Sequence, residues 1–330
     1  LGPSGFVDSI VEANRTVITA FNDIIQDGLI RVTYVPGNHD MLVTAGEIQR
    51  VFPGINQARD AQGLGVYSPA SLPKLAIEHG HRYDFFNAPD PVSNRDITKT
   101  ASILSPGFFV SKVAASSDLE TGKTGYYRDI LTDDPSVQKA GSYLSYLAAW
   151  ELILLAKPVT ESRADRVIMT GIDGYTAQYA INDLVPRGLP LDVLLFKNIE
   201  DSWWDQRQVA NRVPEKIYAE TAIAAGAVNR VMDLQSEKQY FLNSTSNKRI
   251  VVFGHTHVAT LLNLANYKLQ GTIYANSGTW VDKVSRNASS CTYVAIVPQK
   301  SNGATTDTVT VYQYNGDGKS TKLKSGAIRN

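Results

Sequence analysis

Residues 30–40 read IRVTYVPGNHD. The first six, Ile30–Val35, are rich in β-branched and aromatic residues, which predicts a short strand. The strand runs directly into Pro36–Asp40, a cluster of turn-forming residues. The stretch therefore predicts a strand that ends in a polar loop, and this loop carries the first histidine of the chain, His39.

The segments on either side of this stretch alternate between helix and strand. Apolar residues recur at helical spacing over residues 6–27, and Gly28 stands where a C-terminal cap glycine belongs. A capping box that begins at Thr44 predicts a short helix ending near residue 51. Leu75–Glu78 has the composition of a buried strand. This order predicts an α/β fold, in which functional residues gather on loops just beyond the strand ends.

The character of the chain changes between residues 85 and 248. Stretches rich in Ser, Gly and Thr precede long helical patterns, of which residues 142–156 and 215–242 are the strongest. We interpret 85–248 as a mostly helical insertion. Short strands at Arg166–Thr170 and Asp192–Phe196 remain an alternative for part of it.

The strand pattern returns after residue 249, and the segment from Gly316 onward is rich in Gly, Lys and Ser. We expect this last segment to fray. Four strands are predicted before it, over Arg249–Phe253, Thr272–Ala275, Thr292–Val297 and Thr308–Tyr314.

The composition excludes several classes of protein. A chain of 330 residues with 43% hydrophobic residues can bury a core as one large domain or two small ones. Because Lys+Arg and Asp+Glu both number 32, the net charge is zero, and we expect no nucleic-acid partner. The single cysteine, Cys291, excludes an intrachain disulfide. The most apolar run, Leu147–Val159, is too short and too interrupted to span a membrane, so no transmembrane segment is expected.

All five histidines fall in three short clusters, and each cluster follows a predicted strand. A lone histidine is more often a satisfied core or surface group than a ligand. That alternative weakens here because each cluster contains a glycine, which permits a tight turn or a close backbone approach. Imidazole is the commonest side-chain metal ligand, so the sequence predicts a shared metal site. The clusters are Gly37 with His39, His79 and His81 around Gly80, and Gly254 with His255 and His257.

These clusters carry a resemblance to the calcineurin-like metallophosphoesterase superfamily. The order of the motifs and their position at strand ends both resemble that family, and Tyr274–Trp280 looks like the family's usual continuation. The resemblance covers roughly residues 1–84 and 249–285 and does not account for the insertion. The motifs are Gly37-Asn38-His39-Asp40, His79-Gly80-His81 and Gly254-His255-Thr256-His257.

The resemblance implies a fold and a division into domains. The fold is α/β, a metallophosphoesterase-type β-sandwich flanked by helices, with a mostly helical insertion. Residues 1–84 and 249–330 would form the core, and residues 85–248 the insertion. The insertion begins just after the His79 loop and ends just before the His255 loop, so it is placed to act as a cap that sets substrate choice.

The resemblance also implies two divalent metal ions, with Mn, Fe, Zn and Co all suited to mixed His, Asn and carboxylate sites. Asn38 would supply an amide oxygen to one ion. His79 and His255 would supply imidazole nitrogens to the same ion. His257 would be a ligand of the other ion.

In the same resemblance, His39 is not a ligand and faces the substrate. It would stabilise charge on the phosphoryl group or protonate the leaving oxygen. Asp40 would hold His39 in its tautomer and orientation.

The activity that follows is hydrolysis of a phosphate ester or pyrophosphate bond in a small phosphorylated substrate, by metal-activated water. Two divalent ions about 3.5–4 Å apart can bind both the attacking and the leaving oxygen of such a reaction. The alternative is a degenerate, non-catalytic member of the family that acts as a binding or scaffold module.

Two further family motifs are missing from the sequence. An Asp-x-His and a Gly-Asp-x-x-Asp, expected before residues 37–40, would supply the remaining ligands of the first ion and the carboxylate that bridges both ions. Our interpretation is that the sequence is truncated and that its parent protein carries both motifs. The truncated chain itself is then a candidate for an inactive form.

Three weaker signals leave two interpretations each. His81 either lines the substrate pocket or braces its loop. Arg82 either neutralises substrate phosphate or is solvated or ion-paired. Trp203 and Trp204 either have a functional role, as an apolar lid or part of a partner surface, or belong to the core, and core packing is the favoured interpretation.

Overall fold

The computed structural model describes residues 3–112, 166, 168–172, 174–184, 193–197, 201–280, 290–299 and 305–329. These residues form a mixed α/β structure with several sheets, the largest of five strands. The chain divides into two compact units, residues 1–79 with 247–330 and residues 80–246. The borders of the units lie within a few residues of the expected junctions at 84/85 and 248/249. None of the helices in these ranges is long and apolar enough to cross a lipid bilayer.

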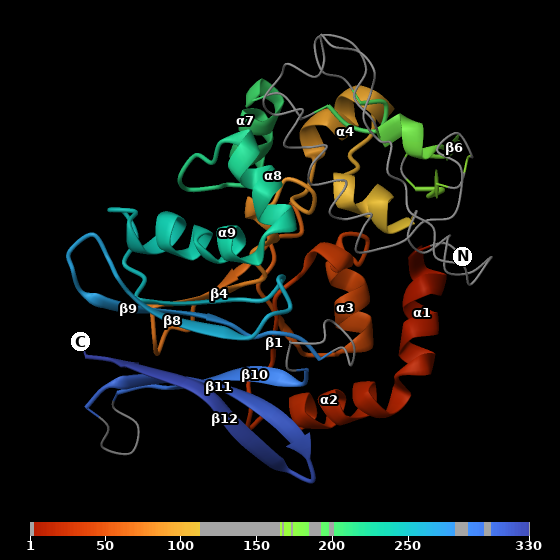
Figure 1. Ribbon diagram of the computed structural model, residues 1–330. Helices are drawn as coiled ribbons and strands as arrows, with labels where there is room; N and C mark the ends of the chain where they lie inside the picture. The colour runs from red at the N-terminus through yellow and green to blue at the C-terminus, as the bar shows by residue number, and fades with distance from the viewer. Residues whose placement is uncertain are drawn as a thin grey trace. The chain divides into compact units, whose positions relative to one another are not determined.

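The five-stranded sheet belongs to the first unit and is mixed (Figure 1). Its three central strands are parallel, and each edge strand is antiparallel to its neighbour. Most residues of the central strands are apolar and buried, which is typical of parallel strands that are covered on both faces. The strand order is β3 (Val66–Tyr67), β4 (Leu75–Glu78), β7 (Ile250–Phe253), β9 (Gly271–Asn276) and β8 (Thr260–Ala265).

The predicted strands at 75–78 and 249–253 are confirmed as β4 and β7, and the one at 272–275 as β9. The two edge strands, β3 and β8, were not predicted from the sequence. The two residues of β3 are too few to show a pattern. In β8, Asn263 interrupts the apolar residues.

A second sheet holds the C-terminal strands β10 (Thr292–Val297), β11 (Asp307–Gly316) and β12 (Lys319–Ile328), all antiparallel. The first two confirm the predicted strands. The expected frayed tail is wrong, because β12 pairs with β11 along its length. Gly316 pairs with Lys319, and the two residues between them have positive φ angles of 54° and 70°. Such a two-residue loop matches the right-handed twist of a hairpin.

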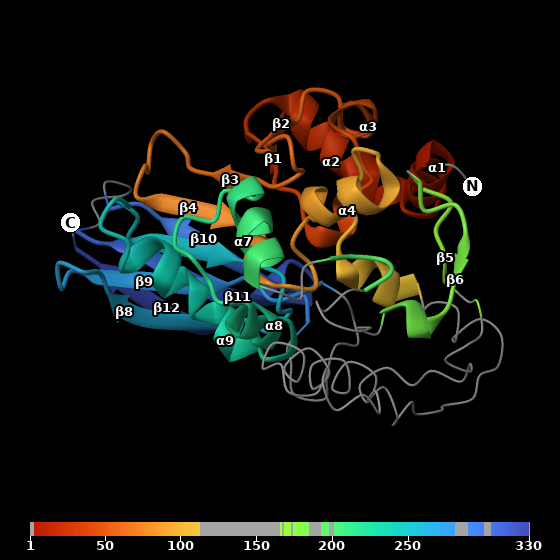
Figure 2. The same cartoon turned by 90° about the horizontal axis from the view of Figure 1, so that it is seen from above.

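One apolar cluster joins residues of these two sheets. Val252 and Ile273 of the five-stranded sheet belong to it, together with Val309 and Val311 of β11 and Ile328 of β12. Ile273, Val309 and Val311 are almost completely buried. Figures 1 and 2 both show the two sheets side by side within this unit.

The N-terminal segment forms two helices where one was predicted. α1 (Pro3–Ala13) and α2 (Arg15–Asp27) are separated at Asn14, whose side-chain amide donates to the Ile10 carbonyl. A side chain that bonds locally to the backbone in this way competes with the helical hydrogen bonds. The predicted cap is confirmed, because Gly28 ends α2 with a φ of 70°.

The predicted strand at 30–35 is present but short. β1 (Thr33–Tyr34) pairs in parallel with β2 (Asn56–Gln57), and the two views show α2 beside this pair (Figure 2). The capping box is confirmed at the start of α3 (Ala45–Val51), where the Thr44 hydroxyl accepts the Glu47 amide at 3.1 Å.

The described part of residues 80–246 is mainly helical. The predicted helix at 142–156 lies outside the described residues. The pattern at 215–242 is broken, since Val228 is extended (φ −127°, ψ 103°) between two helices. Its α-helices and helical turns are η2 (His81–Tyr83), α4 (Pro91–Thr98), η3 (Ile181–Leu184), α7 (Asp201–Ala210), α8 (Ala219–Ala227), α9 (Asn229–Asp233) and a π-helical turn, η4 (Glu237–Phe241).

Two details of this unit answer questions that the sequence left open. The alternative strand at 166–170 is present in part as β5 (Ile168–Met169), paired with β6 (Gln178–Tyr179), whereas 192–196 holds a single bridge between Val193 and Phe196. Trp204 is fully buried, and its indole N–H donates to the Ile217 carbonyl at 2.9 Å. The core interpretation of Trp204 is therefore confirmed.

Candidate functional site

The loop after β1 is closed by its own acidic residue. Asp40 ends a short 3-10 turn, Asn38–Asp40, and its carboxylate accepts the Gly37 N–H at 2.8 Å. Within this turn Asn38 is half-buried, whereas His39 is exposed. The loop therefore directs its amide into the protein and leaves its imidazole accessible to a solute.

His79 follows β4 and lies against the Asn38 side chain. The distance between His79 Nε2 and Asn38 Oδ1 is 2.9 Å. Two glycines make room for this imidazole. A Cβ atom on Gly37 would approach the ring to 3.1 Å, and one on Gly254 would approach Nδ1 to 3.2 Å. The glycines of two histidine clusters thus serve the close approach that the sequence analysis expected of them.

The loop after β7 carries His255 and His257 in an unusual backbone conformation. Their φ angles are 65° and 61°, in the left-handed region, which few residues other than glycine adopt, although histidine, asparagine and aspartate do so more often than the rest. Residues held in such conformations cluster at active sites and ligand sites, where the surrounding structure over-determines them.

Asn276, the last residue of β9, holds this loop. Its side-chain amide donates to the Gly254 carbonyl at 2.5 Å, and its Oδ1 accepts the Gly278 N–H at 3.0 Å. The residue is completely buried. The sequence analysis noted residues 274–280 only as part of a resemblance and gave Asn276 no role.

β4 and β7 are parallel neighbours, so the loops that follow them bring His79 and His255 together, and Asn38 of the loop after β1 reaches His79. The ring centroids of His79 and His255 are 5.2 Å apart. His257 and His39 lie close enough to His79 to lower its pKa. Four histidines and Asn38, from three separate parts of the sequence, therefore share one site.

Two half-buried imidazoles of this site, those of His79 and His257, have lowered pKa values and so favour the neutral form. Burial lowers the pKa of His79 from 6.5 to about 3, with smaller contributions from His255, His39 and His257. Burial also lowers the pKa of His257, followed by the effects of His255 and His39. A metal ion binds neutral imidazole, so these environments suit metal ligation at neutral pH.

The donor set fits one divalent ion. His79 and His255 offer imidazole nitrogens and Asn38 an amide oxygen, a mixed set that suits Mn, Fe, Zn or Co. In the ranges that the structure describes, no group of three or more His, Cys, Asp or Glu side chains is arranged to hold a metal. Toward a second ion these residues contribute His257 alone, so the dinuclear centre stays a prediction.

Asp40 makes contacts that its expected role, the orientation of His39, does not include. Besides accepting the Gly37 N–H, its carboxylate lies near Tyr34, whose pKa is raised first by burial and then by Asp40. The guanidinium carbon of Arg59 lies 5.6 Å from the centre of the Tyr34 ring. The expected orientation of His39 by Asp40 stays a prediction, whereas the closure of the loop by Asp40 is present.

His81 and Arg82 lie in the other unit, on η2 directly after Gly80. Both are buried, with exposed fractions of 2% and 6%, and Arg82 Nη1 donates to the Asn211 carbonyl at 3.2 Å. The burial of His81 favours the interpretation in which it braces its loop. Arg82 is buried rather than solvated, and it bonds to a backbone carbonyl of its own unit. A direct role of either residue in substrate binding stays a prediction.

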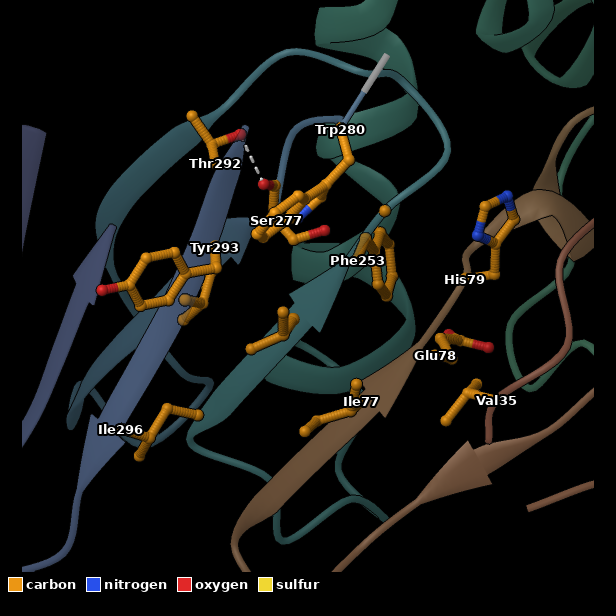
Figure 3. Close-up of a pocket in the computed structure, with 13 residues that line it drawn as sticks. Val35, Ile77, Glu78, His79, Phe253, Ser277, Trp280, Thr292, Tyr293 and Ile296 are labelled. Carbon is orange, nitrogen blue, oxygen red and sulfur yellow. Dashed lines mark hydrogen bonds between the residues drawn. The ribbon is translucent and has the colours of Figure 1, made fainter. Parts of the chain in front are cut away.

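A cavity of about 340 Å³ adjoins His79 (Figure 3). Glu78 and His79 border it from β4, and Ser277 and Trp280 border it from the loop after β9. The sequence analysis assigned no function to Glu78 or Trp280, because neither stands in a histidine cluster.

Replacing Asn276 with Ala is expected to lower the free energy of unfolding by about 1–3 kcal/mol, because the half-buried Gly254 carbonyl and Gly278 amide lose their partner. Divalent-ion affinity should fall by about 10–100-fold, since the loop that presents His255 loses its support. Urea denaturation and calorimetric titration with Mn²⁺ measure the two effects. The matched control is Asn263→Ala, an exposed asparagine on β8. Equal losses in the two variants would contradict the role of Asn276.

The lowered pKa of His79 predicts acid sensitivity of the metal-free protein. Between about pH 6.5 and pH 3 the unfolded chain binds a proton at this residue and the folded chain does not, so stability rises with pH across this window. Above pH 6.5 His79 is neutral in both the folded and the unfolded chain, and stability no longer depends on its protonation. As pH falls below 6.5, this single group should lower the free energy of unfolding by about 1.4 kcal/mol per pH unit.

This acid effect is measured by denaturation in EDTA at pH 7, 6, 5 and 4, for the wild type and His79→Gln. The variant is expected to show a shallower dependence of the free energy of unfolding on pH. Parallel curves for the two proteins would show that His79 is not the group responsible.

Comparisons with known proteins add no support to the family resemblance, which rests on the sequence motifs alone. The sequence matches no protein-family model. No curated protein and no solved structure matches it either.

Proposed function

We propose that this protein hydrolyses a phosphate ester or pyrophosphate bond with the help of divalent metal ions. The observation that carries the proposal is the convergence of Asn38, His79 and His255, with 2.9 Å between the Asn38 and His79 donor atoms and 5.2 Å between the two imidazoles. These three residues come from loops separated by about 40 and 175 positions in the sequence.

The chain's own residues divide into two roles under this proposal. Asn38, His79 and His255 would hold one divalent ion, and His257 would contribute to a second. Such ions polarise phosphoryl oxygens and make water a nucleophile at neutral pH. His39 is exposed at the same site, so it can donate a proton to the leaving oxygen or a hydrogen bond to the phosphoryl group. Asp40 fixes the turn that presents it.

The fold part of the proposal is a metallophosphoesterase-type sandwich of the five-stranded and three-stranded sheets. It is supported by the apolar cluster that Val252 and Ile273 form with Val309 and Val311. The unit of residues 80–246 begins directly after His79 and ends shortly before β7. This connectivity supports our proposal that it is an insertion that sets substrate choice.

Hydrolysis assays on the purified protein test the proposal. A monoester (p-nitrophenyl phosphate), a diester (bis-p-nitrophenyl phosphate) and inorganic pyrophosphate are supplied with Mn²⁺, Zn²⁺, Co²⁺ or EDTA. We expect turnover of at least one substrate with one of the ions and none in EDTA. Turnover that is unchanged by EDTA, or no turnover with any ion, would overturn the proposal.

A second candidate is a non-catalytic binding module. The observation in its favour is that, among the described residues, no group of three or more His, Cys, Asp or Glu side chains is arranged to hold a metal. A binding module retains its ion in the same titrations but hydrolyses none of the three substrates, so the assays above separate the two candidates.

A further inference from the structure

The cavity beside His79 has one polar side and a mostly apolar interior. Its polar side is formed by Glu78 and His79, at the end of β4 (Figure 3). Ile77 of β4, Val252 of β7 and Ile296 of β10 line its walls. Ligand pockets of proteins are mostly apolar, with a few polar groups that fix orientation, and they begin at about 300 Å³. At about 340 Å³ the cavity is large enough for one ring system.

Trp280 borders this cavity and is exposed to a degree that is unusual for tryptophan. Its exposed fraction is 63%, whereas tryptophans are on average highly buried. It is also held in place, because its ring stacks on Tyr314 with 6.4 Å between centroids and 21° between planes. The preceding residue, Thr279, is buried, and its carbonyl accepts the Thr292 amide. Trp280 therefore forms a fixed aromatic surface at the cavity.

Two polar side chains near Trp280 are engaged within the protein. The Thr292 hydroxyl donates to the Ser277 carbonyl at 2.8 Å, and Asn276 is occupied with Gly254 and Gly278. A ligand group at this end of the cavity therefore meets mainly the ring of Trp280 and apolar walls, with the Ser277 hydroxyl beside them, and must be recognised chiefly by shape and stacking. A flat, apolar ring satisfies that requirement, whereas a polyol or a short alkyl chain does not.

We propose that Trp280 stacks on a planar ring carried by the substrate, so that the protein prefers aryl or nucleoside phosphates. This inference rests on the proposed function for the phosphate, because His79 borders the same cavity. The ring contributes through stacking on Trp280 and contact with the apolar walls. Stacking of a base on an aromatic side chain is worth about 1–3 kcal/mol, which corresponds to about a 5–150-fold change in affinity.

Calorimetric titration of the protein as purified tests the ring preference without any turnover. The probes are phenylphosphonate and methylphosphonate, which share the anion and differ in the ring. We expect phenylphosphonate to bind at least about 10-fold more tightly, and Trp280→Ala to lose about 5–150-fold of that affinity without a change for methylphosphonate. Trp280→Phe should retain most of it. The matched control is Tyr267→Ala, an exposed aromatic residue away from the cavity lining.

Hydrolysis of phenyl phosphate, methyl phosphate and AMP by the same variants identifies the source of the ring. A loss in kcat/KM that Trp280→Ala causes for AMP alone indicates a nucleoside, and an equal loss for phenyl phosphate indicates any aryl ester. Ring-dependent binding without hydrolysis would overturn the proposed function and leave the ring site intact. Equal binding of the two phosphonates by the wild type, or unchanged phenylphosphonate binding by Trp280→Ala, would overturn the inference.

Discussion

Replacement of His39 by Ala is expected to lower kcat for the best phosphate ester by about 10²–10⁴-fold, the usual contribution of a general acid or base. The reason is its position. His39 is exposed at the site that Asn38 and His79 form, whereas it is absent from the donor set for the ion. A residue that acts only in the transition state lowers kcat and kcat/KM together when it is removed. Steady-state kinetics with saturating divalent ion measure both.

Two controls accompany the His39 variant. Its metal content and thermal midpoint should equal those of the wild type, because an exposed side chain outside the donor set supports neither. Imidazole added to the variant should restore part of the activity, since an exposed position leaves room for it. Wild-type turnover by His39→Ala would show that our role for this residue is wrong, and loss of bound metal would place it among the ligands.

Replacement of Arg207 by Met is expected to be the most destabilising change in the unit of residues 80–246. Arg207 is fully buried on α7, and it donates to the backbone carbonyls of Ala88 and Pro89. Burial lowers the pKa of Arg207 to about 10, with Asp90 and Asp84 acting in the opposite direction, so the group stays charged at neutral pH. Its guanidinium also lies 5.2 Å from the centre of the Trp204 ring.

Removing one partner of a buried charged set leaves the others unpaired, which costs about 3–5 kcal/mol. We expect Arg207→Met to lose that amount in urea denaturation, and Arg207→Lys to lose less, because lysine keeps the charge but not the planar fork of donors. Arg230→Met, an exposed arginine on α9, is the matched control. If Arg207→Met and this control agree within about 0.5 kcal/mol, the expected range for surface changes, the buried set does not stabilise the unit.

The sequence predicted where the candidate site residues stand along the chain better than it predicted how their backbone is held. Strands that end at Glu78 and Phe253 were recognisable because continuous apolar runs stop at glycine and histidine. Parallel strand ends meet at one edge of a sheet, so the convergence of His79 and His255 followed from that recognition. The left-handed backbone of His255 and His257 and its support by Asn276 were not predictable. They depend on a hydrogen bond between residues 22 positions apart.

The errors in the fold have local physical causes. The helix at 6–27 breaks at Asn14, because an asparagine side chain can bond to the backbone and apolar periodicity does not register this. β12 was missed because its exposed Lys and Ser residues resemble a disordered tail, whereas its two-residue turn with positive φ angles pairs it to β11. Pairing to a neighbour, and not burial of its own side chains, makes this segment a strand.

The burial of Arg207, in the unit of residues 80–246, was equally unpredictable from local sequence. Nothing in the local sequence distinguishes Arg207 from the exposed arginines of the chain. Its burial follows from carbonyls about 118 positions away, at Ala88 and Pro89. Charge patterns in a sequence therefore predict surface residues well and predict buried charged groups poorly.

Metal content per chain tests the central claim most directly. The wild type, His79→Gln, His255→Gln and His39→Ala are dialysed against Mn²⁺ or Zn²⁺ and then against buffer, and bound metal is measured by elemental analysis. The account predicts at least one ion per wild-type chain, little or none in His79→Gln and His255→Gln, and the wild-type amount in His39→Ala. A wild-type chain that retains no metal, or equal retention by all four proteins, would contradict it.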